Sequence, residues 1–185
     1  ESAGGPPSAA ASSPPATTQD TQTRCGFIAL IGAPNAGKST LINALVQSKV
    51  SIVSHKVQTT RMPVRGIAIE GKSQLVFIDT PGIFRPKRRL DRAMVQAAWG
   101  GAHDADIVVM LVDAAKGIEE DLERILAKLA DAPHPKILVL NKVDRPSADP
   151  DKALNEIFEL FLALGATDEQ ADFPILYASG KEGWA

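Results

Sequence analysis

The chain has 185 residues, of which 44% are hydrophobic and 23% are charged, and its formal net charge is −2. This composition suits a globular domain that buries a core without disulfides, and it argues against a chain that is disordered throughout. Because Cys25 is the single cysteine, an internal disulfide is excluded, and the lack of a signal-peptide core or a long apolar run points to a reducing, cytoplasmic location.

Residues 1–23 contain no aliphatic side chain larger than alanine and are rich in Ala, Ser, Pro and Thr. Such a segment cannot offset the entropy of ordering, so we predict a disordered tail without chemistry. From Arg24 onward, apolar runs alternate with amphipathic helical patterns. This alternation is typical of an α/β fold with a mostly parallel sheet, and we predict one such domain over residues 24–185.

The predicted sheet has six strands, separated by helices that cover both of its faces. The predicted strands span residues 26–31, 64–70, 74–79, 107–112, 137–140 and 174–177. The second and third strands turn at Gly71-Lys72 and form an antiparallel edge, whereas residues 49–62 lack periodicity and form a long loop. The first helix spans residues 37–48. The residues predicted to face the core from the later helices are Leu90, Met94, Ala97, Ala98, Leu122, Ile125, Leu126, Leu129, Leu154, Ile157, Phe158, Phe161 and Leu162.

A glycine-rich loop follows the first predicted strand and precedes the first predicted helix. Gly32 and Gly37 let the backbone turn its N–H groups inward, Lys38 reaches the outer phosphates of a nucleotide, and the Ser39 hydroxyl is a ligand for magnesium. The loop is therefore predicted to be the phosphate-binding loop of a P-loop NTPase. Its predicted nucleotide-binding residues are Gly32, Ala33, Pro34, Asn35, Ala36, Gly37, Lys38, Ser39 and Thr40.

Two further segments supply groups for the phosphates and the metal. In the turn Asp79-Thr80-Pro81-Gly82, the Asp79 carboxylate can hold magnesium through water, and the Gly82 N–H can meet a γ-phosphate. In the long loop, Thr60, with Thr59 as the alternative, can complete the magnesium shell. We expect Lys38, Thr60 and Gly82 to act in catalysis and Ser39, Thr60 and Asp79 to hold magnesium.

A guanine-reading segment follows the strand predicted at residues 137–140. The Asp144 carboxylate can accept both the N1–H and the N2 amine of guanine, a pair of donors that adenine lacks, and Lys142 can lay its stem along the purine. Asn141 belongs to the same motif. In the last loop, Ser179-Gly180-Lys181 offers a backbone N–H to the guanine carbonyl. The set predicts a GTP- and GDP-binding switch whose loops respond to the γ-phosphate.

Residues 24 to about 144 resemble the GTPase domain of the Era-type ribosome-assembly GTPases, down to Lys49-Val50-Ser51-Ile52-Val53-Ser54 and Gln58-Thr59-Thr60-Arg61. The resemblance implies a small GTPase-like fold and the ribosomal small subunit or its rRNA as partner, with peripheral membrane contact and a monomeric state as further expectations. It also makes Asn35 a potassium ligand. Ile83 stands where many signalling GTPases carry a glutamine that orients water, so slow hydrolysis is expected.

Beyond residue 144 the resemblance changes. Arg145-Pro146-Ser147-Ala148 and residues 155–179 are similar to translational GTPases of the TypA/BipA type. The chain therefore reads as a splice of two GTPase domains, and we expect misfit where the helix at residues 155–164 packs on an Era-like sheet. Era-type proteins continue into another helix and an RNA-binding KH domain, both of which we expect to be absent here.

Two alternatives stay open from the sequence. The chain is also compatible with a TypA/BipA-like fragment or with a nucleotide-dependent interaction module whose hydrolysis is negligible. A P-loop kinase is disfavoured because it has no use for residues 141–144.

The charge distribution adds a further candidate surface. Residues 24–101 carry twelve Lys and Arg against three Asp and Glu, whereas residues 102–185 carry eight Lys and Arg against seventeen Asp and Glu. Among these bases, Arg85, Lys87, Arg88, Arg89 and Arg92 form a cluster that either contacts RNA or is a solvated face.

Overall fold

A computed structural model describes residues 23–53, 60–130 and 132–184. The predicted tail lies outside this part of the chain except for Thr23, and so do Gln58 and Thr59. The strands are β1 (Arg24–Gly32), β2 (Val64–Glu70), β3 (Ser73–Asp79), β4 (Ile107–Asp113), β5 (Lys136–Asn141) and β6 (Ile175–Ala178). The helices are α1 (Lys38–Leu45), α2 (Arg89–His103), α3 (Glu120–Ala130), α4 (Pro150–Ala163) and α5 (Asp168–Ala171).

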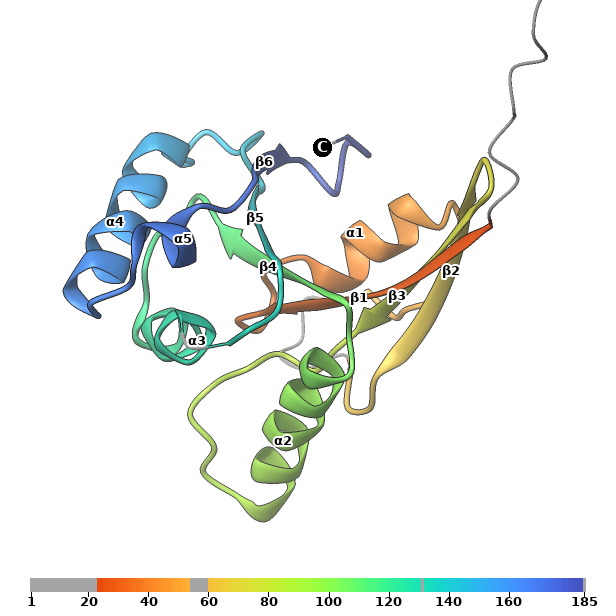
Figure 1. The fold of residues 1–185 in the computed structure, drawn as a ribbon, viewed down its shortest axis with the longest axis horizontal. Coiled ribbons are helices and arrows are strands. Elements are labelled where there is room, and N and C mark those ends of the chain that lie inside the picture. Colours follow the sequence, from red (N-terminus) through yellow and green to blue (C-terminus); the bar gives the residue numbers. More distant parts are fainter. Residues whose placement is uncertain (1–22, 54–59, 131, 185) are drawn as a thin grey trace, which may run out of the picture.

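The six strands form one sheet in the order β2-β3-β1-β4-β5-β6 (Figure 1). Only the β2–β3 pair of this sheet is antiparallel, and the four other neighbouring pairs are parallel. The predicted fold class is therefore confirmed, including the antiparallel edge. Because the parallel strands run in one direction, their carboxyl ends meet at a single edge, where ligands of open α/β sheets bind.

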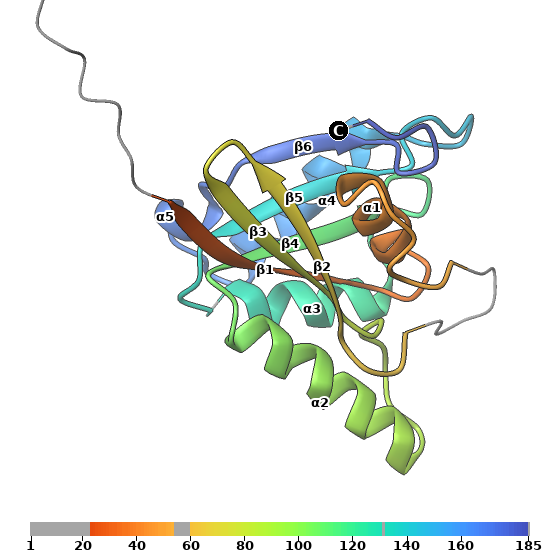
Figure 2. The same ribbon diagram turned by 90° about the vertical axis from the view of Figure 1, so that its right-hand side faces the viewer.

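Helices cover both faces of the sheet, as predicted. Leu41 and Ile42 of α1 pack on one face with Leu30 and Leu111 of the sheet. The other face carries α2, α3 and α4, whose buried residues form a second apolar cluster. Figure 2 shows α1 on the near face of the sheet and α3 and α4 behind it.

Two residues predicted to lie in the core are exposed instead. Leu90 is 57% exposed because it lies in the first turn of α2, at the end of the helix that extends past the sheet (Figure 1). Leu162 is 70% exposed because it directly follows Phe161, and the next position on a helix points about 100° away. The remaining predicted core positions are buried or partly buried.

The expected misfit at residues 155–164 is wrong. Ala153, Ile157 and Phe161 of α4 are 1%, 0% and 2% exposed and belong to the large apolar cluster. The Phe161 ring also packs against the ring of Phe173, with 5.4 Å between centroids. Whatever the origin of this segment, its apolar spacing matches the surface that α3 and the sheet present to it.

The short helix α5 was not predicted, because four residues are too few for an apolar periodicity. Its start is fixed locally: the Thr167 hydroxyl accepts a hydrogen bond from Gln170 N at 3.3 Å, and Gln170 Oε1 accepts one from Thr167 N at 2.9 Å. No helix in residues 23–53, 60–130 or 132–184 combines the length and the apolar character that crossing a membrane requires.

Candidate nucleotide-binding site

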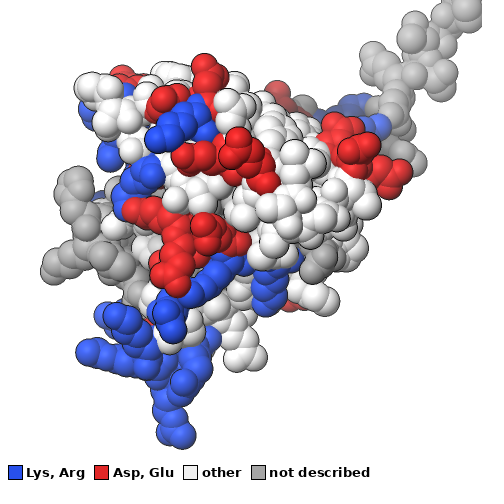
Figure 3. All heavy atoms as spheres, turned by 90° about the vertical axis from the view of Figure 1, so that its left-hand side faces the viewer, with Lys and Arg blue, Asp and Glu red and all other residues white. Residues whose placement is uncertain are grey.

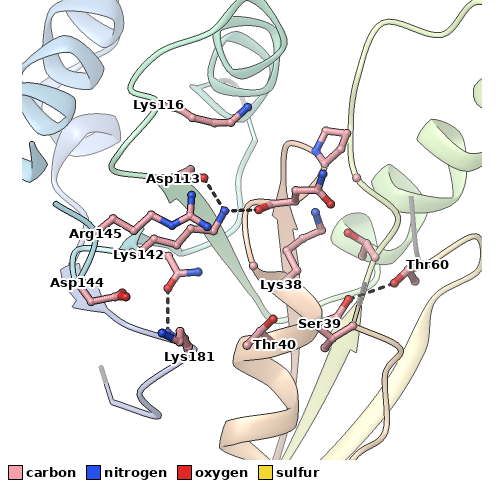
Figure 4. Close-up of a pocket in the computed structure, with 18 residues that line it drawn as sticks. Lys38, Ser39, Thr40, Thr60, Asp113, Lys116, Lys142, Asp144, Arg145 and Lys181 are labelled. Atoms are coloured by element: carbon pink, nitrogen blue, oxygen red, sulfur yellow. Dashed lines mark hydrogen bonds and ion pairs between the residues drawn. The ribbon is translucent and has the colours of Figure 1, made fainter. Parts of the chain in front are cut away.

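A cavity of about 520 Å³ opens at the carboxyl edge of the sheet (Figure 4). It joins the loop after β1, the start of α1, and the loops after β3, β4, β5 and β6. Its lining residues are Pro34, Asn35, Gly37, Lys38, Ser39, Thr40, Val53, Thr60, Thr80, Gly82, Asp113, Lys116, Asn141, Lys142, Asp144, Arg145, Gly180 and Lys181. Lys38 and Asp144, which sequence analysis assigned to opposite ends of one nucleotide, therefore share a single cavity.

Two glycines of the loop after β1 occupy conformations that exclude other residues. Gly37 has φ of 106°, and a Cβ there would lie 2.1 Å from the Nδ2 atom of Asn141. Gly32 has φ of 153°, and a Cβ there would lie 2.5 Å from the carbonyl oxygen of Leu111. The loop thus curls between the ends of β4 and β5, and both glycines are needed because only glycine lacks the Cβ that would clash.

The Lys38 ammonium lies under this loop. Its Nζ atom donates to the carbonyl oxygens of Gly32 at 3.1 Å and Ala33 at 3.0 Å, and the residue is only 6% exposed. Burial lowers the pKa of Lys38 to about 8, because desolvation disfavours the charged amine; nearby Asp79 raises this pKa and Lys142 lowers it. A phosphate group placed beside this amine would supply the negative charge that favours its protonated form.

Three oxygen-bearing side chains meet where magnesium was predicted. Asp79 Oδ2 accepts hydrogen bonds from Ser39 Oγ at 2.7 Å and from Thr60 Oγ1 at 3.0 Å, and the two hydroxyls lie 3.3 Å apart. Asp79 is 0% exposed, yet its second oxygen, Oδ1, has no hydrogen-bond partner among the described residues. A buried carboxylate oxygen without a partner is costly, and an oxygen-rich cluster with such an atom fits a magnesium ion with its bound water.

Asn141 ties the guanine-reading segment to the phosphate loop. Its Nδ2 atom donates to the carbonyl oxygen of Ala36 at 2.8 Å, and its Oδ1 atom accepts from Gly180 N at 3.1 Å. The residue is 1% exposed. Both polar ends of the Asn141 amide are therefore used to hold three loops together, which makes it a structural link between the two ends of the cavity.

Lys142 makes a second connection across the cavity. Its Nζ atom lies 2.5 Å from Asp113 Oδ2 and 2.5 Å from the carbonyl oxygen of Asn35 (Figure 4). The Asp113 side chain is 6% exposed, and that of Lys142 is 18% exposed. This ion pair at the end of β4 fixes the direction of the Lys142 stem, which borders the space between the phosphate loop and Asp144.

Asp144 is exposed at the far end of the cavity. The pKa of its carboxyl lies below the usual value, chiefly because the Ser179 side chain donates a hydrogen bond to it. The Ser179 hydroxyl oxygen also accepts from Glu182 N at 3.1 Å. Asp144 is thus held ionised and oriented by the loop after β6, as a group that accepts hydrogen bonds from a base must be.

Several predicted binding residues support the cavity without lining it: Gly32, Ala33, Ala36, Asp79, Pro81 and Ser179. Thr80 does line the cavity, but its hydroxyl donates to the carbonyl oxygen of Leu30 at 2.6 Å and so holds β3 to β1. Gly82 packs so closely on the phosphate loop that a Cβ there would lie 2.8 Å from Pro34 Cα.

The structure adds four lining residues that sequence analysis did not assign: Val53, Asp113, Lys116 and Arg145. For Asp113 a signal existed, because it ends β4 as Asp79 ends β3 and Asn141 ends β5. Polar residues that end neighbouring parallel strands lie at the same edge of the sheet.

Ile83 lies away from the cavity. It is 4% exposed and belongs to the large apolar cluster, while its backbone N–H donates to the carbonyl oxygen of Gly32 at 3.1 Å. Its side chain therefore serves the core, and only the backbone of this segment faces the phosphate loop.

A protein-family model described as 50S ribosome-binding GTPase matches residues 27–142. GTPase Era from Brucella suis biovar 1 (strain 1330) is 64% identical over 138 residues, which are 75% of this chain and 44% of that protein. GTPase Era from Bradyrhizobium diazoefficiens is 69% identical over 122 residues, which are 66% of this chain and 40% of that protein. The chain thus spans less than half the length of these curated relatives.

Two crystal structures of Era proteins are also similar to the structure of this chain. The crystal structure of Era in complex with MgGDPNP and nucleotides 1506-1542 of 16S ribosomal RNA matches 88% of this chain and 53% of that chain, with a TM-score of 0.74 and 34% identity. The crystal structure of an Era variant from Aquifex aeolicus bound to GDP.AlF4- matches 86% of this chain and 52% of that chain, with a TM-score of 0.73 and 35% identity.

Proposed function

The chain belongs to the family of 50S ribosome-binding GTPases, and from that membership we propose that it binds GTP, hydrolyses it slowly and switches conformation between its nucleotide states. One observation carries the proposal: a single cavity runs from the Lys38 ammonium to the Asp144 carboxylate. A site that held only phosphates would have no use for the second end. A site built for adenine would not place an ionised carboxylate where the base offers no pair of donors.

Magnesium would be held by Ser39, Thr60 and, through water, Asp79. The support is the convergence of their oxygens and the unpartnered Oδ1 atom of Asp79. When bound, the ion supplies positive charge to the phosphates and offsets the charge that develops on them during transfer. Because Thr60 belongs to the loop between α1 and β2, its position is expected to depend on the ion and the γ-phosphate.

Hydrolysis is assigned to Lys38, the backbone N–H of Gly82 and Thr60. Ile83 is buried in the core and cannot orient the attacking water, so this group of residues lacks a side chain for that task. We therefore expect turnover on the order of 10⁻⁴ to 10⁻² per second, which is the range of GTPases that act without an arginine finger in trans. If single-turnover hydrolysis in magnesium does not exceed the uncatalysed control, the alternative of a non-hydrolysing interaction module replaces this proposal.

Potassium is proposed as a further cofactor, with Asn35 as its ligand. Asn35 is exposed and lines the cavity beside the phosphate loop, with φ of 61°. A cation there would add positive charge close to the phosphates, where an arginine finger acts in other GTPases. Hydrolysis should accelerate several-fold in potassium over sodium. Equal rates in the two salts, or an Asn35→Ala variant that keeps the acceleration, would remove Asn35 from this role.

The ribosomal small subunit or its rRNA is proposed as the partner. The support is similarity to Era proteins, one of which forms a crystalline complex with a segment of 16S ribosomal RNA. A cytoplasmic location and a monomeric state are proposed on the same similarity, and peripheral membrane contact stays a prediction. The likeness of residues 145–185 to TypA/BipA-type translational GTPases also stays a prediction, to be tested by exchanging this segment between the two types.

Nucleotide competition is the decisive experiment. GTP and GDP should raise the melting temperature of the chain in magnesium far more than ATP does at the same concentration. Equal stabilisation by ATP would discredit the guanine assignment and favour a P-loop kinase. Stabilisation by neither nucleotide would contradict the proposal as a whole.

A further inference from the structure

Five basic side chains lie together where the chain passes from the nucleotide cavity into α2. This α2 basic patch consists of Arg85, Lys87, Arg88, Arg89 and Arg92, all of which are exposed. Figure 3 shows Lys and Arg side chains gathered at the foot of the molecule, where α2 begins, with acidic side chains above them. Arg85 follows the cavity-lining Gly82 by three residues, and none of the five side chains lines the cavity itself.

The patch lies at the unfavourable end of its helix. The first turn of an α-helix carries a partial positive charge, which favours acidic residues and disfavours basic ones. In the first turn of α2, Asp91 is the only acidic residue, whereas the helix starts at Arg88 and Arg89 and continues to Arg92. Five cations beside a positive helix end therefore raise the electrostatic free energy of the free protein, and an anion would lower it.

The single acid in this turn is already used by the backbone. Asp91 Oδ2 accepts hydrogen bonds from Lys87 N at 3.0 Å and Arg88 N at 2.9 Å, and these bonds lower the pKa of Asp91. The carboxylate thus caps the helix, and the charges of Arg88 and Arg92 lower its pKa further. No ion pair among the described residues joins Asp91 to a side chain of the patch, so one carboxylate faces five basic side chains.

Other acids neutralise the patch only at its border. Arg85 Nη1 lies 3.8 Å from Glu120 Oε1 of α3, and both side chains are more than two thirds exposed. Ion pairs this exposed contribute little free energy. Across residues 23–53, 60–130 and 132–184, no ion pair involves Lys87, Arg88, Arg89 or Arg92.

We propose that the α2 basic patch binds the phosphate backbone of double-helical RNA. Four of its five bases are arginine, whose planar guanidinium pairs with phosphate oxygens through two parallel hydrogen bonds. The neighbouring aromatic residue, Phe84, is half-buried, so the patch offers no exposed ring on which single-stranded bases could stack. A charged surface of this kind reads the shape and charge of a duplex rather than its bases.

An anionic membrane is the competing ligand for such a patch. Leu90 is 57% exposed beside the arginines and could enter a lipid headgroup layer. Stable membrane binding needs a continuous apolar face, however, and Leu90 is the one large apolar side chain of residues 84–92 that is exposed. RNA is therefore favoured. This choice among polyanions rests on the proposed function, whereas the existence of an anion-binding surface does not.

The test uses the full chain and a labelled 16-base-pair RNA duplex of arbitrary sequence, with fluorescence anisotropy measured between 50 and 200 mM salt. We expect a Kd on the order of 10⁻⁵ M at low salt and a slope of about −3 in the plot of log K against log salt, as for roughly three phosphate contacts. The variant Arg88→Ala/Arg89→Ala/Arg92→Ala should bind at least tenfold more weakly. Its slope should approach zero.

The matched control removes three exposed bases from other surfaces, in the variant Lys49→Ala/Arg65→Ala/Lys152→Ala, which should bind RNA within twofold of the unmodified chain. Equal losses in the two triple variants would mean attraction by net charge alone and would overturn the proposal. So would salt-independent binding, or patch-dependent binding to phosphatidylserine vesicles without binding to RNA.

Folding and nucleotide binding are measured on the same samples. GTP should stabilise both triple variants as it stabilises the unmodified chain, because neither variant changes the nucleotide cavity. If the patch variant does not fold, the single change Arg92→Ala should weaken RNA binding about two- to threefold and lower the magnitude of the salt slope by about one. RNA binding that is lost while GTP binding persists identifies the patch itself, whereas failure of GTP binding in the unmodified chain contradicts only the proposed function.

Discussion

The two ends of the nucleotide cavity differ in how far they are organised in the free protein. At the phosphate end, Lys38, Thr60 and Asp79 are between 0% and 7% exposed and their polar atoms are joined to one another or to the loop. At the guanine end, Asp144 and Lys181 are exposed, although Asn141 and Ser179, which hold the surrounding loops, are 1% and 0% exposed. The phosphate end is thus preorganised, and the guanine end discriminates between bases. Affinity should depend mainly on the first end and base selectivity on the second.

The largest effect is expected at the phosphate end. Lys38→Ala removes a buried ammonium that no other side chain replaces, so GTP affinity should fall by two to three orders of magnitude, or about 3 to 4 kcal/mol. ATP, which presents the same phosphates, should lose affinity by the same factor. Isothermal titration calorimetry with both nucleotides measures this. Lys152→Ala, an exposed lysine on α4, is the control and should change neither affinity.

A result in which Lys38→Ala alters the ratio of GTP to ATP affinity would contradict the division of the cavity into two ends. The ratio is the informative quantity because a variant that folds poorly lowers both affinities. Thermal unfolding of the nucleotide-free variant separates this effect, since removing a buried cation should not destabilise the chain below pH 8.

The second effect is expected at the guanine end. Asp144→Asn keeps the size of the side chain but replaces an acceptor of two hydrogen bonds by an amide that presents donors. GTP affinity should fall about 100-fold, as expected when two hydrogen bonds to a charged group are lost, and ATP affinity should stay the same. Asp151→Asn, an exposed position at the start of α4, is the isosteric control. Unaltered GTP affinity in Asp144→Asn would remove Asp144 from the site.

The third effect is pH dependence at the phosphate end. The pKa of Lys38 is about 8 in the folded, nucleotide-free chain, whereas a lysine side chain in water has a pKa of 10.5. Bound phosphate favours the protonated amine, so GTP binding above pH 8 must take up a proton, and affinity should fall roughly tenfold between pH 7 and pH 9. Calorimetry in buffers of different ionisation enthalpy detects this proton. The uptake should vanish in Lys38→Ala.

The stability of the nucleotide-free chain should rise with pH, whereas GTP affinity falls. Because the unfolded chain binds more protons than the folded chain between pH 8 and about pH 10.5, the free energy of unfolding should rise over that window, by an amount on the order of 3 kcal/mol from this residue. Urea unfolding at pH 7.5 and pH 9.5, compared between the unmodified chain and Lys38→Ala, isolates the contribution. A stability that falls equally in both would place the Lys38 amine in a more solvated setting.

The sequence predicts where the binding motifs of the two ends meet, but not how each of their side chains is directed. The motifs at residues 32–40, 79–82 and 141–144 each follow a strand, so their meeting at one edge follows from the parallel order of the sheet. The direction of individual side chains does not follow. Thr80 belongs to the predicted set but turns its hydroxyl to Leu30, and Ser179 acts through Asp144 instead of lining the cavity.

The errors in the core have equally local causes. Leu90 and Leu162 fit the apolar spacing of their helices, but spacing does not tell where a helix passes the edge of the sheet or which of two adjacent leucine and phenylalanine residues faces inward. Asp113 was missed because a lone carboxylate at a strand end carries no motif, and its meaning depends on Lys142, which lies 29 residues away in the sequence.

Asp113 gives the smallest and most discriminating test of the comparison, because its partner Lys142 bridges the two ends of the cavity. Asp113→Ala leaves the Lys142 amine with the Asn35 carbonyl alone, so the stem should lose its fixed direction along the purine and GTP affinity should fall about five- to tenfold. Asp113→Asn keeps an acceptor oxygen and should recover part of that loss.

Affinities for GTP and inosine triphosphate should be measured for both variants. Inosine lacks the N2 amine, from which Asp144 would accept a hydrogen bond. The ratio of the GTP and inosine triphosphate affinities therefore depends on Asp144 and not on Lys142. Asp113→Ala should therefore weaken both nucleotides and leave their ratio within twofold, whereas Asp144→Asn should collapse the ratio. A ratio that falls in Asp113→Ala would mean that the ion pair also positions Asp144, and the two ends of the cavity would then act as one unit.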